Sequence, residues 1–435
     1  METLLSPGDD LLAESLAQEV RIEEFLAEGT QGEVYRAEMN GRQVAVKWYK
    51  PEWIRIDPQL RERLKGTSVR EPPSPRYLWP EAIVVSSERP GFGYVMPYRG
   101  PRFRDFDYVI NEQLKVSLRT LATAFLQTAE DYELLHAPGL CYVDVSAGNI
   151  AVDPTTGEVR ICDCDNVDVN GNGKHSVISG TDGFMAPEIV QMLDYPNRQS
   201  DLWSLAVLIF WAFVKNHPLL GRKEYECQVF TPKDQLRLLG PEALFIFDPD
   251  NPSNRPVTGY NIGALTYWPI YPEFMRELFM RAFTSGIRNP QGGRVYEGEW
   301  RDAMAQLRDS IITCPHCGAE NFYDGDFPHW CWQCRTELVP PRRIVLPNAS
   351  VVMEDGAALY PYHVDPTRHF DSSAPVALVV RHPQRRDLLG LENRTQAAWR
   401  VILPDQKELT VPPGGCVGLN PQVLIAFGSN MAEIV

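Results

Sequence analysis

The 435-residue sequence contains no long apolar run. Its longest, Leu205–Val214, falls well short of the roughly 18 residues that a helix needs to cross a bilayer, so it predicts a buried helix. Positive charge is also scarce, because 42 basic residues stand against 57 acidic ones and give a net charge of −15. With no basic block to offset that balance, the composition excludes a general binder of nucleic acids or membrane surfaces.

Cysteine is scarce as well, with nine residues in all. Four of them form two Cys-x-x-Cys pairs and the other five are scattered, which fits a reducing compartment with one metal site better than a disulfide framework. The segment Met1–Asp10 has neither a basic stretch nor an apolar core, so we expect no signal peptide and a cytoplasmic protein. The length predicts two to four domains, and residues 1–20 look like a helical N-terminal extension.

A predicted hairpin gathers three polar side chains. Two short apolar runs, Ile150–Val152 and Val159–Cys162, flank a turn rich in proline, threonine and glycine. Asp144 and Asn149 lie just before the first run, and Asp163 lies at the end of the second. Two carboxylates and an amide at one end of a sheet are what a hydroxyl-activating base and a magnesium site require.

A glycine-rich turn, Gly29–Gly32, interrupts the strand pattern that ends at the hairpin signal Asn40-Gly41. Glycines in such a turn let backbone N–H groups approach phosphates. The following strand, Val44–Lys47, ends in a lysine. Such a lysine is commonly a solvated edge charge, but opposite a glycine-rich flap it predicts a cation that pairs with phosphate.

These motifs give residues 21–310 a resemblance to the eukaryotic-type protein kinase fold. Gly29 and Gly32 match the last two glycines of its flap, and the strand that ends at Lys47 matches its Val-Ala-Ile-Lys motif. The hinge between lobes follows a gatekeeper at Met96. The resemblance implies an ATP site formed by Ala27, Gly29, Thr30, Gly32, Val34, Ala45, Lys47 and Met96 and by the backbone of Pro97 and Tyr98.

The segment Leu60–Leu64 resembles helix αC of that fold. The resemblance implies that Glu62 forms an ion pair with Lys47 beside the nucleotide. The alternative is a solvated glutamate on the face of a helix.

The catalytic loop aligns as Tyr142–Asn149 with the kinase pattern His-Arg-Asp-Leu-Lys-Pro-x-Asn. The resemblance implies that Asp144 accepts the proton of the substrate hydroxyl and that Asn149 holds a magnesium ion. Asp163 stands where the metal-binding aspartate of Asp-Phe-Gly is expected. The loop that follows, residues 169–176, suits an activation segment.

The segment Gly180–Glu188 matches the Gly-Thr…Ala-Pro-Glu end of the activation segment, which small-molecule kinases generally lack. Asp201 matches the aspartate that braces the catalytic loop, just after Ser200, a predicted helix N-cap. The resemblance also implies that Arg294 pairs with Glu188.

Three residues depart from the family pattern. Val143 replaces an arginine that usually receives a phosphorylated residue, and Ser146 replaces a lysine near the transferred group. Asp165 replaces a glycine. We expect this change either to alter the motion of the activation segment or to add a metal ligand. We expect an active, divergent Ser/Thr protein kinase, with a nucleotide-binding pseudokinase scaffold as the alternative.

Beyond the kinase-like region, two cysteine pairs predict a zinc ribbon. Four thiolates, from Cys314, Cys317, Cys331 and Cys334, close a tetrahedral site with no open position, so the zinc is expected to be structural. It substitutes for a core that a segment of roughly 30 residues cannot build.

The remaining sequence reads as short strands without helical periodicity. It predicts a small β-sandwich, somewhat like a forkhead-associated domain, with strands near residues 376–380, 398–403, 408–411 and 423–428. We therefore predict an α+β protein with a bilobal kinase-like fold, a zinc ribbon and a small all-β domain. The expected boundaries are 21–98 and 99–310 for the lobes, 311–338 for the ribbon and 344–435 for the β-rich domain.

This arrangement resembles a group of divergent bacterial kinases. Kinases of that group are found with a von Willebrand A-type protein and a PP2C-type phosphatase in phosphorylation modules of the tellurite or stress response. The resemblance implies those partners, together with ATP, Mg²⁺ and Zn²⁺ as cofactors.

Overall fold

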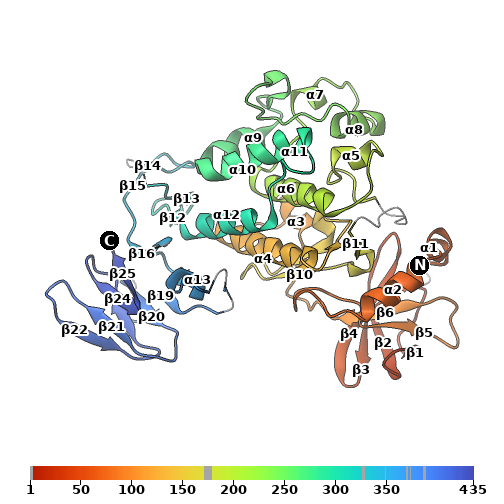
Figure 1. Cartoon of the computed structure of the whole chain (residues 1–435), viewed down its shortest axis with the longest axis horizontal. Coiled ribbons are helices and arrows are strands. Elements are labelled where there is room, and N and C mark those ends of the chain that lie inside the picture. Colours follow the sequence, from red (N-terminus) through yellow and green to blue (C-terminus); the bar gives the residue numbers. More distant parts are fainter. Residues whose placement is uncertain are drawn as a thin grey trace. The chain divides into compact units, whose positions relative to one another are not determined.

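The structure is a computed structural model that describes residues 3–170, 179–325, 329–347, 349–368, 371–372, 374–385 and 388–435. It divides into two compact units, Met1–Pro269 with Glu273–Met304 and Ile270–Pro272 with Ala305–Val435 (Figure 1). Among the described residues, none of the helices has the length and apolar character that crossing a membrane requires.

The first unit begins with six antiparallel strands that close into a barrel in the order β1-β2-β3-β4-β6-β5. The helix expected over residues 1–20 is wrong, because residues 10–13 form the first strand, in which Leu11 and Ala13 face the core. Buried and exposed residues alternate here, which is the period of a strand with one buried face and not the period of a helix. The strands are β1 Asp10–Ala13, β2 Gln18–Glu28, β3 Gly32–Met39, β4 Arg42–Tyr49, β5 Ala82–Val85 and β6 Gly93–Pro97, and the helices beside them are α1 Pro51–Ile56 and α2 Leu60–Ser68.

The rest of the first unit is mainly helical. The apolar run Leu205–Val214 lies in the central helix α6, where nearly every side chain is buried, as its composition predicts. Asn197 caps that helix, so Ser200, expected at the cap, instead occupies the third helical position of a capping box. The helices are α3 Asp107–Ile110, α4 Leu118–His136, α5 Pro187–Val190, α6 Arg198–Val214, α7 Arg222–Tyr225, α8 Pro232–Leu239, α9 Ile262–Tyr267, α10 Glu273–Phe283, α11 Ser285–Arg288 and α12 Glu297–Asp309.

In the described part of this unit, five short strands lie among the helices. The expected hairpin is present, with β9 Ile150–Val152 paired antiparallel to β10 Val159–Ile161. A third strand, β7 Arg104–Asp105, joins the same sheet beside β9. The remaining pair is β8 Leu140–Cys141 with β11 Asp168–Val169.

The second unit contains two short hairpins and two larger sheets. The sheets have the strand orders β17-β16-β25-β24-β21-β22 and β18-β19-β20-β23. Their buried side chains, among them Val351, Leu391, Trp399 and Ile425, form one shared core. The elements are β12 Ile311–Thr313, β13 Glu320–Phe322, β14 His329–Trp330, β15 Glu337–Leu338, β16 Arg343–Leu346, β17 Ala349–Val352, β18 Ala358–Leu359, α13 Pro361–Val364, β19 Ala377–Arg381, β20 Leu389–Asn393, β21 Trp399–Ile402, β22 Glu408–Val411, β23 Cys416–Gly418, β24 Leu424–Phe427 and β25 Asn430–Ile434.

Candidate active site and cysteine cluster

The β9–β10 hairpin brings the three predicted polar residues together. A 3₁₀ turn at Ala147–Asn149 leads into β9, and the N–H of Cys162 donates to the carbonyl of Asn149 over 2.8 Å. Nδ2 of Asn149 donates to the Asp144 carbonyl at 2.8 Å and lies 3.1 Å from Oδ2 of the same residue. Asp163 follows Cys162 directly, so both carboxylates and the amide lie at one end of the hairpin.

Asp201 at the start of α6 braces the catalytic loop, as predicted. Its buried carboxylate accepts hydrogen bonds from the N–H groups of Tyr142, at 2.6 Å, and Val143, at 3.0 Å. Val143 has a φ of 75°, a left-handed conformation that is costly for a β-branched residue. The charge-assisted hydrogen bonds to Asp201 therefore stabilise an unfavourable backbone conformation at Val143, directly before Asp144.

The Asp144 carboxylate already accepts a hydroxyl hydrogen bond. Oγ1 of Thr181, in the segment predicted to end the activation loop, donates to Oδ1 of Asp144 over 2.6 Å. Burial raises the pKa of Asp144 above its ordinary value, although the hydrogen bonds from Thr181 and Asn149 act in the opposite direction. A carboxylate with a raised pKa that accepts from a hydroxyl group is suited to act as a base.

Lys47, at the predicted phosphate-binding position on β4, is almost completely buried and has three polar partner residues. Its Nζ lies 2.6 Å from Oε1 of Gln31 on the flap, 3.1 Å from Oδ1 of Asp163 and 3.0 Å from Oδ2 of Asp165. Burial alone lowers the pKa of Lys47, but the two carboxylates outweigh it and raise the pKa above its ordinary value. The lysine therefore remains a cation inside the site.

The predicted pairing of Glu62 with Lys47 is not found. The segment Leu60–Leu64 does form a helix, α2, but the Glu62 side chain is 75% exposed and pairs with Lys65 at 3.0 Å. The buried face of this helix is made by Leu60, Leu64 and Thr67 instead. The periodicity of these apolar residues turns Glu62 toward solvent.

The remaining residues predicted to bind the nucleotide lie on the barrel and its flap. Ala27 pairs with Val34 across β2 and β3, and Ala45 pairs with Met96 across β4 and β6. Of the ten predicted positions, the buried ones are Gly32, Ala45, Lys47 and Met96, whereas Val34, Pro97 and Tyr98 are half-buried and Ala27, Gly29 and Thr30 are exposed.

Gly32 has a packing role that the sequence did not reveal. A Cβ atom at this position would lie 2.3 Å from the carbonyl oxygen of Trp48 on β4. Gly29, by contrast, has no contact closer than 3.7 Å at that position. The second glycine is therefore required by the approach of two strands, whatever the flap binds.

The predicted pair between Glu188 and Arg294 is confirmed. Nη2 of Arg294 lies 2.7 and 2.8 Å from the two carboxylate oxygens of Glu188, and the arginine side chain is 2% exposed. This pair fixes the end of the segment that carries Thr181. Most of the preceding loop, at residues 171–178, lies outside the described residues, so the prediction of an activation segment there is tested only at its two ends.

Comparison with known proteins supports the assignment that this geometry suggests. Residues 93–246 match the protein kinase domain family. The chain is 29% identical over 219 residues to the serine/threonine-protein kinase PknA of Mycobacterium tuberculosis, a match that covers 48% of this chain and 49% of PknA. It is also 26% identical over 247 residues to protein kinase C delta type of Mus musculus, covering 52% and 35% of the two chains.

A third relative is the probable serine/threonine-protein kinase gdt4 of Dictyostelium discoideum, at 26% identity over 201 residues, covering 44% of this chain and 12% of gdt4. The chain thus spans only about half the length of PknA, the first of these relatives.

His136, at the end of α4, links two buried carboxylates beneath the catalytic loop. Its Nε2 lies 2.9 Å from Oδ2 of Asp201, and its Nδ1 contacts Oε1 of Glu297. Burial alone lowers the pKa of His136, but its bonds with Asp201 and Glu297 outweigh it and raise the pKa above its ordinary value. Burial raises the pKa of Glu297, yet His136 and Arg198 outweigh it and lower that pKa to about 2.

We expect the stability of the first unit to fall as the pH rises above neutrality. The pKa of His136 is higher in the folded than in the unfolded state, so protonated His136 stabilises the fold. This stabilisation is fully present below the ordinary histidine pKa of about 6.5 and is lost as the pH rises through the pKa of the folded state. Each unit by which the pKa in the folded state exceeds that in the unfolded state corresponds to about 1.4 kcal/mol of unfolding free energy. Urea unfolding across this pH range measures the loss, and the His136→Asn variant should lack it. A variant with the wild-type pH dependence would contradict this assignment.

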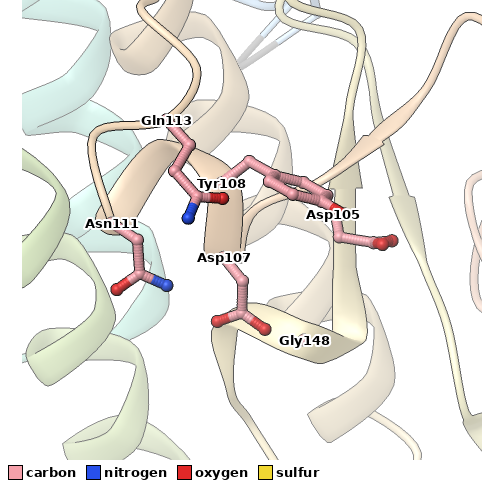
Figure 2. Close-up of a pocket in the computed structure, with 6 residues that line it drawn as sticks. All are labelled: Asp105, Asp107, Tyr108, Asn111, Gln113 and Gly148. Carbon is pink, nitrogen blue, oxygen red and sulfur yellow. The ribbon is translucent and has the colours of Figure 1, made fainter.

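A polar cavity of about 380 Å³ borders the catalytic loop at Gly148. Figure 2 shows the Asp107 carboxylate directed toward the turn at Gly148. Burial, and then the neighbouring charge of Asp105, raise the pKa of Asp107. The cavity is therefore acidic and lies on the same loop as Asp144; its lining is completed by Asn111 and Gln113.

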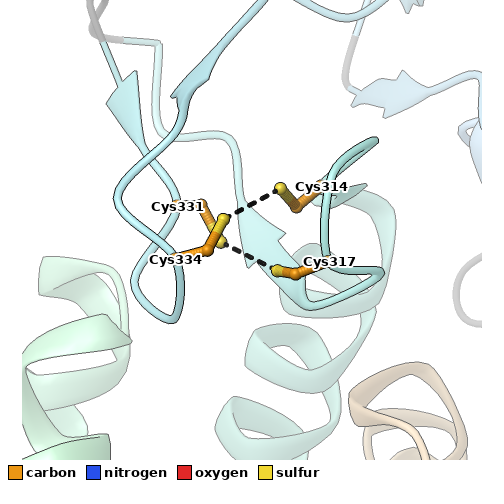
Figure 3. Close-up of side chains that lie close together, drawn as sticks. All are labelled: Cys314, Cys317, Cys331 and Cys334. Atoms are coloured by element: carbon orange, nitrogen blue, oxygen red, sulfur yellow. Dashed lines mark hydrogen bonds between the residues drawn. The ribbon is translucent and has the colours of Figure 1, made fainter.

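The four cysteines of the predicted ribbon converge in the second unit (Figure 3). Their Sγ atoms all lie within 4.8 Å of one another, and the pairs Cys314–Cys334 and Cys317–Cys331 are each 3.6 Å apart. Tetrahedral zinc with Zn–S bonds of about 2.3 Å places its sulfurs about 3.8 Å apart. The spacing of the thiols therefore fits a metal of this kind.

Two similar turns place these cysteines. In each, the first cysteine of a pair closes a short hairpin, and the residue after the second cysteine has a left-handed conformation, with φ of 75° at Gly318 and 61° at Arg335. Hydrogen bonds with the hydroxyl and backbone of Thr336 lower the pKa of Cys334 to about 5. A thiol with a lowered pKa is readily available as the thiolate that binds metal.

Proposed function

We propose that the protein is an ATP-dependent Ser/Thr protein kinase that transfers the γ-phosphoryl group of ATP to a protein hydroxyl. The observation that carries the proposal is the hydrogen bond from the Thr181 hydroxyl to Asp144, at 2.6 Å. A substrate serine or threonine would present the same group to the same carboxylate. Lys47 and Asp163 lie at the other side of the site, joined by a 3.1 Å ion pair.

The residues of this site fit ATP and Mg²⁺. Asn149 and Asp163 supply the amide and carboxylate oxygens that magnesium prefers, and the Asp163 side chain is 39% exposed and therefore accessible. Lys47 supplies a buried cation for phosphate oxygens. When bound, magnesium neutralises charge on the transferred phosphoryl group. Asp144 orients the acceptor hydroxyl and takes its proton.

We also propose that Cys314, Cys317, Cys331 and Cys334 hold a structural Zn²⁺ ion. The convergence of four sulfurs supports this, because four thiolate ligands complete a tetrahedral site and leave no position for a substrate. The ribbon of residues 311–338 and the β-rich domain of residues 344–435, expected to be a sandwich, are proposed to dock a protein partner.

By resemblance to the bacterial stress-response kinases, the proposed partners are a von Willebrand A-type protein and a PP2C-type phosphatase. The proposed location is the cytoplasm, which is consistent with nine cysteines, all among the described residues, that form no disulfide.

Incubation of the full chain with γ-labelled ATP, Mg²⁺ and a serine- and threonine-rich acceptor protein tests the proposed activity. We expect label on serine or threonine with the wild type and almost none with the Asp163→Asn variant, since the amide removes the charge that holds the metal. Acid hydrolysis of the product distinguishes these residues from tyrosine. Equal, background labelling by both proteins would refute the kinase assignment.

A pseudokinase scaffold is the second candidate. One observation in its favour is that the Lys47 ammonium group already contacts Gln31 and two carboxylates. The other is that Val143 and Ser146 replace family residues in the catalytic loop. It predicts that MgATP binds to the wild type without any transfer of label.

A further inference from the structure

The buried lysine of the site has a partner that the family pattern does not provide. Asp165 stands where a glycine is expected, two residues after the metal-binding position. Its side chain is fully buried, and Nζ of Lys47 lies 3.0 Å and 3.2 Å from its two carboxylate oxygens. Both carboxylate oxygens of Asp165 contact Lys47, and the alternative expectation, that the residue adds a metal ligand, stays a prediction.

Two tyrosines complete the enclosure of this carboxylate. The hydroxyl of Tyr49 on β4 donates to Oδ2 of Asp165 at 2.5 Å, and the hydroxyl of Tyr94 on β6 donates to Oδ1 at 3.2 Å. Both tyrosine side chains are buried, in the core cluster that also contains Leu60 and Leu64 of α2. Each oxygen of Asp165 thus receives a hydroxyl and the ammonium group, which satisfies a buried charge that would otherwise be very costly.

The other partners of Lys47 are not enclosed in this way. Asp163 is 39% exposed at its side chain, and Gln31 belongs to the flap, where its Nε2 also reaches Oδ1 of Asn166 at 3.3 Å. Phosphate oxygens and magnesium compete for these groups when a nucleotide binds. Asp165 is fully buried, so its ion pair with Lys47 is shielded from phosphate oxygens and magnesium.

We propose that Asp165, rather than a glutamate of α2, is the residue that positions Lys47 for the phosphates, with Tyr49 and Tyr94 holding its carboxylate. This inference rests on the proposed function. It joins two departures from the family pattern: the aspartate in place of a glycine supplies the charge that Glu62, facing solvent, does not. The lysine is then held by the barrel and the segment after β10, without an ion pair from α2.

Three variants test the proposal, with kcat, KM for ATP and the affinities for MgATP and adenosine measured for each. Asp165→Asn is expected to lower kcat roughly 100-fold, because a preorganised charge near the transferred group is lost. It should weaken MgATP binding while leaving adenosine binding unchanged, since adenosine has no phosphate for Lys47. Glu62→Gln should leave all four quantities within about twofold, as expected for an exposed surface pair.

The third variant, Tyr49→Phe, tests the proposal even if the Asp165→Asn variant does not fold. Tyr49→Phe keeps both charges and removes one hydrogen bond to Asp165, so we expect kcat to fall about three- to tenfold. Tyr77→Phe is the matched control, because its hydroxyl donates to the carbonyl of Asp131 on α4 and makes no hydrogen bond to Asp165. A drop in kcat with Tyr77→Phe equal to that with Tyr49→Phe would show only a general effect of destabilisation and would contradict the proposal.

The outcomes separate this inference from the proposed function. If the wild type binds MgATP but transfers nothing, the kinase assignment fails, and a selective loss of MgATP affinity in Asp165→Asn still supports the inference. If Glu62→Gln abolishes transfer while Asp165→Asn remains active, the inference is overturned and the kinase assignment stands. Absence of MgATP binding by the wild type overturns both.

Discussion

The Asp144→Ala variant is expected to transfer phosphoryl groups about 10³-fold more slowly than the wild type, because a positioned general base contributes roughly 10²- to 10⁴-fold. The loss should appear in kcat, with little change in KM for ATP, since Asp144 is proposed to bind the acceptor hydroxyl and Lys47 the phosphates. Steady-state kinetics with labelled ATP measures both constants. The loop itself should stay folded, because Asp201 still binds its backbone.

The matched control is Asp250→Ala, which removes a carboxylate that is 78% exposed on the same unit. It should retain wild-type kinetics. The pKa of Asp144 is raised by burial, so we also expect kcat of the wild type to fall as the pH drops and the carboxylate becomes protonated. An Asp144→Ala variant that kept more than about a tenth of the wild-type kcat would exclude this residue as the base.

Removal of the metal is expected to unfold the ribbon of residues 311–338. Structural zinc sites bind with apparent free energies of about 10–16 kcal/mol in small peptides, and much of that energy is folding energy. A strong chelator, or the Cys331→Ser variant, should therefore release about one zinc per chain and expose the ribbon to proteolysis. Metal analysis by atomic emission and limited proteolysis with mass spectrometry measure the two effects.

Cys416→Ser is the control for this experiment, because Cys416 is an exposed cysteine on β23, outside the cluster. Its metal content and protease resistance should match the wild type. Purified protein without near-stoichiometric zinc, or a ribbon that resists protease after chelation, would rule out a structural metal.

Several features followed from the sequence because they depend on local spacing. The hairpin between Asn149 and Asp163 is defined by two apolar runs and a turn, and the four cysteines by two short motifs. The pair between Glu188 and Arg294 is remote in sequence, yet the family resemblance placed it correctly. In the first two cases a motif fixes the geometry of the side chains that it contains, whereas the third rests on the family resemblance.

Other features depended on which side of a strand or helix is buried, and no sequence motif shows this. Residues 10–13 have helical composition but form the first strand of the barrel, because alternate residues find a buried face there. Glu62 lies on the predicted helix but turns outward, since its apolar neighbours occupy the inner face. The tyrosines that receive Asp165, and the flap contact of Gln31 with Asn166, link residues far apart in the chain.

The sequence by itself predicted the residues that are proposed to carry the chemistry: a lysine, two carboxylates, an amide and four thiols in motifs whose spacing is local. Only the tertiary structure decided which of them meet. A charged group buried in a protein must find a partner, and the partner is set by the packing of strands and helices around it. At Lys47, that packing turned the glutamate of α2 to solvent and placed Asp165 beside the ammonium group.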